Sequence, residues 1–324
     1  MYTVLVTDHP APTPDLEAEL LARVGGRLVV ADTGSEAELL SLVPDADAIL
    51  TCFRHVTPRV VQAGARLRVI GRYGVGVDNI AVDVATERGI PVTNVPVYCV
   101  DEVAEHAIAL LLTLARRTAT YDESVRAGEW RIDAGMPMHR IAGSVLGVVG
   151  FGHIGRAVVA RALGLGMRVL VADRSAEVAE VAAAGAELVE LDRLLTEADA
   201  VSLHLPLTSA THHLLDAKNL ARMKSGAILV NCARGAIVDI DALAIALSEG
   251  RLAGAGLDVF DPERLPVDHP LVGLRSTVLT PHVAFYSEES IAELQRQATE
   301  NVIAVLTGQT PPNLVNPSFR SVQT

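Results

Sequence analysis

Aromatic side chains are scarce in this chain. Only 3% of its 324 residues are Phe, Trp or Tyr, although half of all residues are hydrophobic. A core of that composition has to be built from Val, Leu, Ala and Ile, which suits parallel sheets covered by helices on both faces. We therefore expect an α/β fold, and a chain of this length is expected to form two domains.

Basic residues and cysteines are also few. There are 27 Lys and Arg against 39 Asp and Glu, giving a formal charge of −12. This excludes nucleic acid as a general partner, because neutralising phosphates needs a basic face. The cysteines are odd in number and have no CxxC spacing, which excludes a disulfide framework and favours a cytoplasmic location. They are Cys52, Cys99 and Cys232.

Long apolar runs and metal-ligand spacings are absent from the sequence. The segment Ala107–Ala115 is too short to span a bilayer and has charged flanks, so it predicts a buried helix. The N-terminus begins with a strand pattern and has neither a basic region nor a cleavage signal. We expect no membrane association. We also expect no metal, because the histidines at 204, 212 and 213 lack acidic or Cys partners at suitable spacing.

Short apolar runs alternate with helical patterns from end to end, which is the pattern of βαβ units in a parallel sheet. The helical pattern at 100–117 is apolar over most of its surface, which predicts burial between domains or subunits. Other helical patterns cover residues 16–24, 36–42 and 288–307. The predicted strands are 3–7, 28–31, 48–51, 68–71, 91–94, 145–150, 168–172, 187–189, 200–205, 227–231, 254–259 and 278–280.

The most informative segment is Val145–Asp173, which reads strand, glycine-rich turn, helix, strand, acid. Gly150 permits the tight turn, Gly152 lets a pyrophosphate approach the backbone, and Gly155 allows close packing of helix on strand. A pyrophosphate is stabilised at the helix N-terminus, and a carboxylate at Asp173 can bind both ribose hydroxyls and repel a 2′-phosphate. The segment predicts a nicotinamide dinucleotide site. A turn of the same type without a ligand is the alternative.

Three polar residues each follow a predicted strand: Arg234, Glu263 and His282. Ligands bind at the carboxyl ends of strands in open α/β sheets, so these side chains are expected to share one crevice. An Arg can hold a carboxylate, a His can exchange a hydroxyl proton during hydride transfer, and an acid can orient the His. Taken alone, each also has an ordinary structural explanation.

Read as motifs, these residues point to a known family. The segments NCARGAIVD (231–239), GLDVFDPE (256–263) and TPHVAFYS (280–287) resemble signatures of the D-isomer-specific 2-hydroxyacid dehydrogenases. GRYGVGVDNI (71–80), GIPVTNVP (89–96) and VLGVVGFGHIG (145–155) are similar to that family too. The resemblance extends from about residue 48 to residue 316, with the motifs in the family's order.

The resemblance implies an NAD-dependent D-2-hydroxyacid dehydrogenase, or 2-keto acid reductase. It implies that Arg234 binds the substrate carboxylate and carbonyl, that His282 is the general acid in reduction and base in oxidation, and that Glu263 is its acidic partner. The backbone amides of Gly74, Val75 and Gly76 are expected to bind the substrate carboxylate. The expected cofactor residues are Gly150, Gly152, His153, Ile154, Gly155, Asp173, Leu205, Pro206, Cys232, Ala233 and Asp258, with Asp258 facing the carboxamide.

The resemblance further implies two Rossmann-like or flavodoxin-like, doubly wound parallel-sheet domains with a cleft between them. We expect a substrate-binding domain from residues 1–99 and 287–324, and an NAD-binding domain from 100–286. The long helix at 100–117 favours a homodimer. Arg174 leaves NADP use open, and Arg54, His55 and Arg72 are possible substrate contacts. Glyoxylate, hydroxypyruvate and 3-phosphoglycerate all stay open as substrates.

Within the family, HVAFYSEES (282–290) and NVPVYCVDE (94–102) resemble the branch of C-terminal-binding-protein corepressors and related bacterial dehydrogenases. Phe285 stands where those corepressors carry a tryptophan. The alternative function is therefore an NAD(H)-sensing, corepressor-like binding protein with little turnover. The single tryptophan, Trp130, lies after the long helix and is expected to pack structurally.

Overall fold

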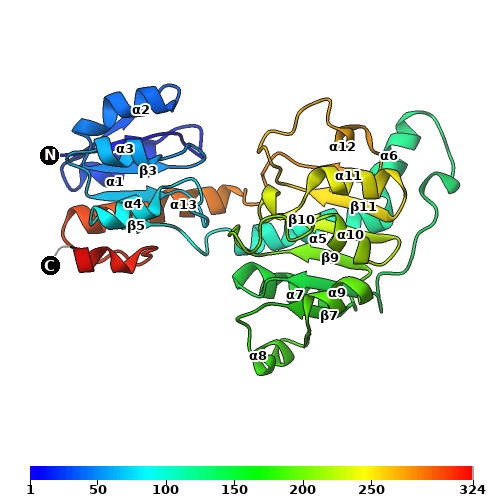
Figure 1. Cartoon of the computed structure of the whole chain (residues 1–324). Coiled ribbons are helices and arrows are strands. Elements are labelled where there is room, and N and C mark those ends of the chain that lie inside the picture. The colour runs from blue at the N-terminus through cyan, green and yellow to red at the C-terminus, as the bar shows by residue number, and fades with distance from the viewer. Residues whose placement is uncertain (323–324) are drawn as a thin grey trace. The chain divides into compact units, whose positions relative to one another are not determined.

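The computed structural model describes residues 1–322 (Figure 1). The chain divides into two compact units. Unit 1 contains Met1–Tyr98 and the segment that starts at Ser287, and unit 2 contains Cys99–Tyr286. Residues 323 and 324, which the predicted substrate domain includes, lie outside the described residues. The α/β class with two parallel sheets, expected from the sequence, is confirmed.

Unit 1 is built on a parallel sheet of five strands in the order β2-β1-β3-β4-β5. This is the flavodoxin-like order. The strands are β1 (Tyr2–Val6), β2 (Gly26–Val30), β3 (Ala48–Thr51), β4 (Val69–Arg72) and β5 (Val92–Thr93), and the helices are α1 (Asp15–Ala22), α2 (Glu36–Leu42), α3 (Pro58–Ala63), α4 (Val82–Glu87) and α13 (Glu288–Leu306).

Two apolar layers cover the sheet of unit 1. One contains side chains of α2, α3 and α4, such as Leu39 and Val60. The other contains α1 and the C-terminal helix α13, through Leu21 and Leu294. Because α13 packs against β3 and β4, both ends of the chain build this unit. A Ser287 capping box starts α13, which satisfies amide groups at its first turn.

Unit 2 is built on a parallel sheet of seven strands in the order β12-β11-β10-β9-β6-β7-β8. Chain order reverses beside β6, the first strand, as in dinucleotide-binding folds. The strands are β6 (Val145–Val149), β7 (Arg168–Ala172), β8 (Glu187–Leu188), β9 (Ala200–Leu203), β10 (Ala227–Asn231), β11 (Leu252–Leu257) and β12 (Thr277–Leu279). The helices are α5 (Val100–Arg116), α6 (Thr118–Arg126), α7 (His153–Gly164), α8 (Val178–Ala183), α9 (Leu191–Glu197), α10 (Ala217–Arg222), α11 (Ile240–Ser248) and α12 (Pro270–Gly273).

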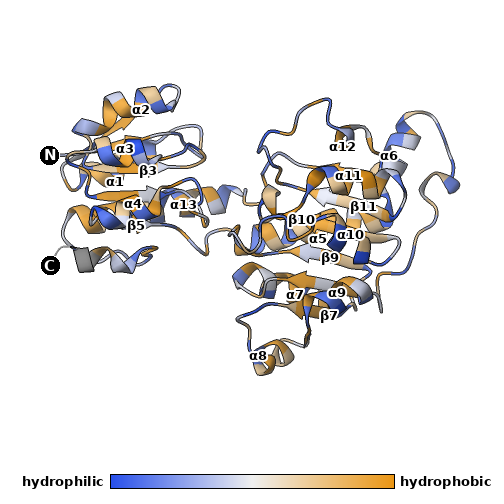
Figure 2. Cartoon of the chain, in the orientation of Figure 1, coloured by the Kyte–Doolittle hydropathy of each residue, from blue (hydrophilic) through white to orange (hydrophobic). Residues whose placement is uncertain are grey.

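Helices cover both faces of this second sheet. Residues of α5 and α7, such as Leu110 and Val158, pack on one face. Residues of α9, α10 and α11, such as Leu194 and Leu243, pack on the other. In Figure 2 many of the strands are orange, whereas the helices mix orange with blue, as expected of strands buried between two helical layers.

The segment that follows α5 differs from the sequence prediction. Residues 118–126 form α6, which the apolar pattern did not indicate, because its sequence TATYDESVR is mostly polar. Trp130 was expected to pack structurally, and this was wrong: 90% of its surface is exposed. Among the described residues, no helix has both the length and the apolar character that a membrane crossing requires.

Candidate active site

The glycine turn predicted from the sequence joins β6 to α7. Gly150 has φ +100°, and a Cβ there would meet the backbone of His204. A Cβ at Gly155 would collide with the carbonyl oxygen of Gly150. A glycine at position 155 therefore lets α7 pack closely against the turn. Gly152 caps α7 and has open space where a Cβ would lie. His153 and Ile154 begin the helix. These residues fit the pyrophosphate of a dinucleotide.

Asp173 follows β7 and lies directly beside this turn. One carboxylate oxygen accepts the N–H of Phe151 at 2.8 Å, and the other accepts the N–H groups of Ser175 at 2.7 Å and Ala176 at 3.1 Å. Partial burial raises the pKa of Asp173, but these hydrogen bonds outweigh it and hold the pKa below its ordinary value. The carboxylate is therefore ionised where a ribose would follow the pyrophosphate.

The other predicted cofactor and catalytic residues follow neighbouring strands of the same sheet. In the order of the sheet, the ends of β9, β10, β11 and β12 adjoin one another. Because parallel strands end at one edge, this edge gathers the chemistry-bearing residues of unit 2. Leu205 and Pro206 follow β9, Cys232, Ala233 and Arg234 follow β10, Asp258 and Glu263 follow β11, and His282 follows β12.

The structure pairs His282 with Glu263. The Nδ1 atom of His282 is hydrogen-bonded to a carboxylate oxygen of Glu263. The His282 side chain is 25% exposed and that of Glu263 is 57% exposed, so the pair is open to small molecules. Phe285 lies edge-on to the imidazole, with the ring centroids 6.0 Å apart. Because Nδ1 is engaged by the acid, Nε2 is the nitrogen placed to exchange a proton with a substrate.

Arg234 lies half-buried in the turn after β10. Its guanidinium donates to the carbonyl of Ala233 at 2.8 Å, and its own carbonyl accepts from the Asn231 side chain at 2.9 Å. The next residue is Gly235, where a Cβ would collide with the backbone of Phe260. A glycine is therefore required to hold the Arg234 turn against the segment that follows β11.

Asp258, directly after β11, is bonded to the segment that carries His282. It is fully buried, and its oxygens accept from the Thr280 hydroxyl at 2.5 Å and from the amides of Val283 and Ala284 at 2.9 Å each. Its backbone carbonyl accepts the N–H of His282 at 2.8 Å. In this structure the carboxylate holds the segment that carries His282, whose φ is +54°. The expected contact of Asp258 with a carboxamide stays a prediction.

His106 and Thr280 are two residues of this network that the sequence reasoning missed. The Nε2 atom of His106, on α5, lies 3.0 Å from the Thr280 hydroxyl. The sequence offered one indication that Thr280 lies near the expected catalytic histidine, since Thr280 and His282 share the motif TPHVAFYS. The histidine on α5 could not be linked to that motif, because the contact joins residues 174 positions apart.

Cys232 and His204 are neutral residues at the same edge. Burial raises the pKa of the Cys232 thiol, so this residue is not an activated nucleophile. Burial lowers the pKa of His204 to about 4, and its ring nitrogen is 2.7 Å from the Ser202 hydroxyl. Within residues 1–322, no group of three or more His, Cys, Asp or Glu side chains is arranged to hold a metal ion.

The remaining predicted residues belong to unit 1. Gly74, Val75 and Gly76 form the turn after β4, and Gly74 has φ +145°. The Gly74 carbonyl accepts the N–H of Val95 at 2.9 Å, and that of Val75 accepts from the Asn94 side chain at 2.6 Å.

The three basic residues that were open as substrate contacts differ in exposure. Arg72 is buried, and its guanidinium donates to the carbonyl of Tyr73. Arg54 and His55 are exposed in the turn after β3. The Arg54 amide and those of Cys52 and Phe53 donate to the Asp8 carboxylate, which fixes this turn.

Comparison with known proteins agrees with this geometry. Residues 108–284 match the family described as D-isomer specific 2-hydroxyacid dehydrogenase, NAD binding domain. A glyoxylate reductase of Korarchaeum cryptofilum is 44% identical over 87% of this chain and 86% of its own length. The chain belongs to the family of D-isomer-specific 2-hydroxyacid dehydrogenases. It is an oxidoreductase that uses a nicotinamide dinucleotide to interconvert 2-hydroxy and 2-keto acids.

Two further relatives of this dehydrogenase are informative. A glyoxylate reductase of Thermococcus litoralis is 42% identical over 86% of each chain. The crystal structure of a D-lactate dehydrogenase from Aquifex aeolicus, complexed with NAD and lactic acid, has a TM-score of 0.88 and 29% identity, covering 97% of this chain and 99% of that one. The relatives named here carry reductase and dehydrogenase names, so they do not support the expected corepressor-like branch.

Proposed function

We propose that this dehydrogenase reduces glyoxylate, or a 2-keto acid of similar size, with NADH. The observation that carries the proposal is the His282–Glu263 pair, which follows β12 and β11 at the same sheet edge as the glycine turn. Two relatives above 40% identity are named glyoxylate reductases, which favours glyoxylate among the small keto acids.

In this proposal His282 protonates the oxygen that develops at C2 during reduction. The nicotinamide, when bound, supplies the hydride that C2 accepts. Glu263 holds the Nδ1 atom of His282, so the ring presents Nε2 to the substrate and its imidazolium is stabilised before the proton leaves. In oxidation the same nitrogen removes the hydroxyl proton.

Arg234 and the Gly74–Gly76 turn are proposed to bind the substrate. A guanidinium can hold a carboxylate and polarise the neighbouring carbonyl, which makes C2 more electrophilic. The amides of Val75 and Gly76 are proposed to bind the carboxylate, as a nest of N–H groups does. The Gly74 N–H donates to the carbonyl of Arg72 at 3.1 Å and belongs to the start of the turn.

NADH is proposed as the preferred cofactor because Asp173 is ionised beside the turn. A carboxylate there accepts hydrogen bonds from ribose hydroxyls and repels a 2′-phosphate. Arg174, the next residue, is the group through which NADPH would be accepted. The ratio of kcat/KM for the two cofactors tests this preference.

A homodimer is proposed from the exposed segment after α6, and not from the long helix α5. The apolar side chains of α5 pack inside unit 2, so this helix by itself does not indicate a partner. The segment after α6 instead exposes Trp130 (90%), Ile132 (79%) and Met136 (64%). A cavity of about 650 Å³ lies at the opposite edge of the same sheet, lined by Leu114, Met167 and Ile228 among others. We propose that the exposed arm of one copy covers this hollow in another.

The mass in solution tests the homodimer. Light scattering is expected to give twice the monomer mass for the wild type and a smaller mass for Trp130→Ser. A monomeric wild type would refute this part of the proposal. A cytoplasmic location is also proposed, since Cys52, Cys99 and Cys232 are all free thiols.

The proposed reaction is tested by following the loss of NADH absorbance with glyoxylate, hydroxypyruvate, pyruvate and 3-phosphoglycerate. We expect turnover, with the highest kcat/KM for glyoxylate. Tight NADH binding without turnover of any acid would refute the proposal. That result would favour the NADH-sensing, corepressor-like alternative.

A further inference from the structure

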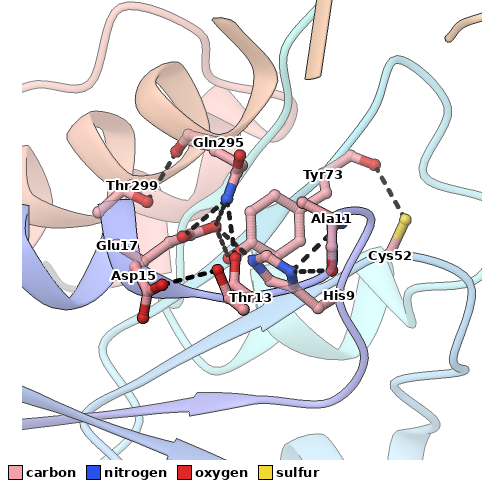
Figure 3. Close-up of polar contacts among 9 residues, drawn as sticks. All are labelled: His9, Ala11, Thr13, Asp15, Glu17, Cys52, Tyr73, Gln295 and Thr299. Carbon is pink, nitrogen blue, oxygen red and sulfur yellow. Dashed lines mark hydrogen bonds and ion pairs between the residues drawn. The ribbon is translucent and has the colours of Figure 1, made fainter. Parts of the chain in front are cut away.

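A buried charge cluster lies in unit 1 and takes no part in the proposed chemistry. Glu17 of α1 has no exposed surface. Its carboxylate accepts from the hydroxyl of Tyr73 at 3.0 Å and from the side chain of Gln295 at 3.0 Å, and it lies 2.7 Å from the Nε2 atom of His9 (Figure 3). The cluster thus joins the end of β1, α1, the end of β4 and α13.

His9 is the cation of this cluster. Nδ1 lies 2.7 Å from the carbonyl oxygen of Ala11, and Nε2 faces Glu17, so both ring nitrogens are directed at acceptors. The amide of Ala11 makes only a longer approach to Nδ1, at 3.2 Å. Burial lowers the pKa of His9, but its bonds to Glu17 and to the Ala11 carbonyl, with the charges of Glu17 and Asp8, raise it above its ordinary value overall.

The charge on His9 compensates a carboxylate that water does not reach. A buried carboxylate without a nearby cation is strongly unfavourable. The other side chains that meet this group are neutral when His9 titrates: burial holds the pKa of Tyr73 well above its ordinary value and that of Cys52 at about 12, and Gln295 of α13 carries no charge. Asp8, next to His9, is committed to three backbone amides.

Tyr73 connects this cluster to the Gly74–Gly76 turn. It is 1% exposed and immediately precedes the turn. Its hydroxyl is held by Glu17, its N–H donates to the carbonyl of Thr51 at 2.8 Å, and its carbonyl accepts from the guanidinium of Arg72. The residue is therefore fixed at the ring and at the backbone, and the turn starts from this fixed point.

We propose that His9 and Glu17 are positioning residues for substrate binding, which hold the Gly74–Gly76 turn in its carboxylate-binding arrangement through Tyr73. The proposal rests on the proposed function, in which amides of this turn bind the substrate carboxylate. Protonated His9 keeps Glu17 in place. When His9 loses its proton, the carboxylate is left without its cation, the hold on the Tyr73 hydroxyl weakens, and the turn loses its arrangement.

The expected signature is a KM effect without a kcat effect. The residues proposed for proton transfer and for the cofactor belong to unit 2, so loosening the turn in unit 1 weakens binding of the keto acid only. His9→Gln, Glu17→Gln and Tyr73→Phe are each expected to raise KM for glyoxylate about fivefold at neutral pH, the scale of one lost ordinary hydrogen bond. kcat and the Kd of NADH are expected to stay within about twofold.

The pH profile separates positioning from a merely structural role. In the wild type, KM is expected to rise as the pH passes through the raised pKa of His9, whereas His9→Gln and Glu17→Gln give a KM without that rise. The variants are compared with the wild type at each pH, so that a pH effect common to all of them cancels. Glu19→Gln is the matched control, because Glu19 lies on the same helix but is exposed and paired with Arg23.

Hydrogen–deuterium exchange of the peptide that contains residues 74–76 provides a readout independent of activity. Exchange is expected to be faster in Tyr73→Phe and Glu17→Gln than in Glu19→Gln at the same pH. Unchanged KM values, or unchanged exchange in variants that remain folded, would overturn the proposal. If the wild type turned over no keto acid, the proposed function would fail, and the exchange experiment would still decide whether the cluster holds the turn.

Discussion

Each unit carries a histidine paired with a glutamate after the end of a strand, and the two pairs differ in burial. In unit 1 the side chains of His9 and Glu17 are 10% and 0% exposed. In unit 2 those of His282 and Glu263 are 25% and 57% exposed. The same two groups therefore occur once in the interior and once at the surface of a sheet edge.

The surroundings of the two pairs assign them different tasks. Both nitrogens of His9 are used within the protein, one by Glu17 and one by the Ala11 carbonyl, so its proton stabilises the fold. In the surface pair, Glu263 holds Nδ1 of His282, and both side chains are more exposed than those of His9 and Glu17. Residue types alone do not distinguish the two pairs, whereas the exposure of their side chains does.

The largest expected effect is on stability, from His9→Ala. The change leaves the Glu17 carboxylate buried without its cation, which costs about 3 kcal/mol when one partner of a buried pair is removed. Urea unfolding of the wild type and the variant at neutral or slightly acidic pH measures this cost. Glu19→Ala is the control and should change the free energy of unfolding little. An equally small change for His9→Ala would mean that the pair is not a structural one.

His282→Ala should lower the activity and leave the stability nearly unchanged. Removing the general acid is expected to lower kcat by at least ~10²-fold, because proton transfer contributes on this scale. The free energy of unfolding should change by about 1 kcal/mol or less, since the pair is open to water. Initial rates of NADH oxidation and urea unfolding measure the two effects. Near-normal turnover would remove His282 from the proposed mechanism.

Glu263→Gln should give a smaller loss than His282→Ala. The amide can still accept a hydrogen bond from Nδ1, but it no longer stabilises an imidazolium, so kcat is expected to fall about tenfold. Glu249→Gln, an exposed change at the end of α11, is the control. A variant as active as this control would show that the acid does not assist the histidine.

The smallest effect is the pH dependence of stability. The pKa of His9 in the folded state is raised above its unfolded value of about 6.5. A raised pKa gives stability that is fully present below the unfolded pKa and is lost as the pH rises through the folded pKa. The wild type should therefore lose part of its stability above neutral pH, by less than His9→Ala removes. The variant should not show that loss, and a parallel decline in both proteins would contradict the assignment.

Much of unit 2 could be predicted because its chemistry follows strand ends. The strand patterns at 145–150 and 168–172 located Gly150 and Asp173, and motifs after three further strands located Arg234, Glu263 and His282. A parallel sheet places such ends at one edge whatever the details of packing.

The rest depended on contacts that local patterns do not record. Glu17 meets Tyr73 and Gln295, which are 56 and 278 positions away, so neither its burial nor its partner His9 could be read from α1. The resemblance implied a cofactor contact for Asp258, but its bonds to Thr280 and Ala284 join residues 22 and 26 positions apart and could not be read from the local pattern. Trp130 was expected to be packed because it is large and apolar, but the structure exposes it.

The most direct test of the account compares His9→Ala and His282→Ala side by side, with kcat for glyoxylate and the free energy of unfolding measured on the same preparations. The account predicts that His282→Ala loses turnover and keeps its stability, while His9→Ala loses stability and, where it remains folded, keeps its kcat. A His9→Ala protein that is stable but has lost its kcat, or a His282→Ala protein that turns over normally, would contradict it.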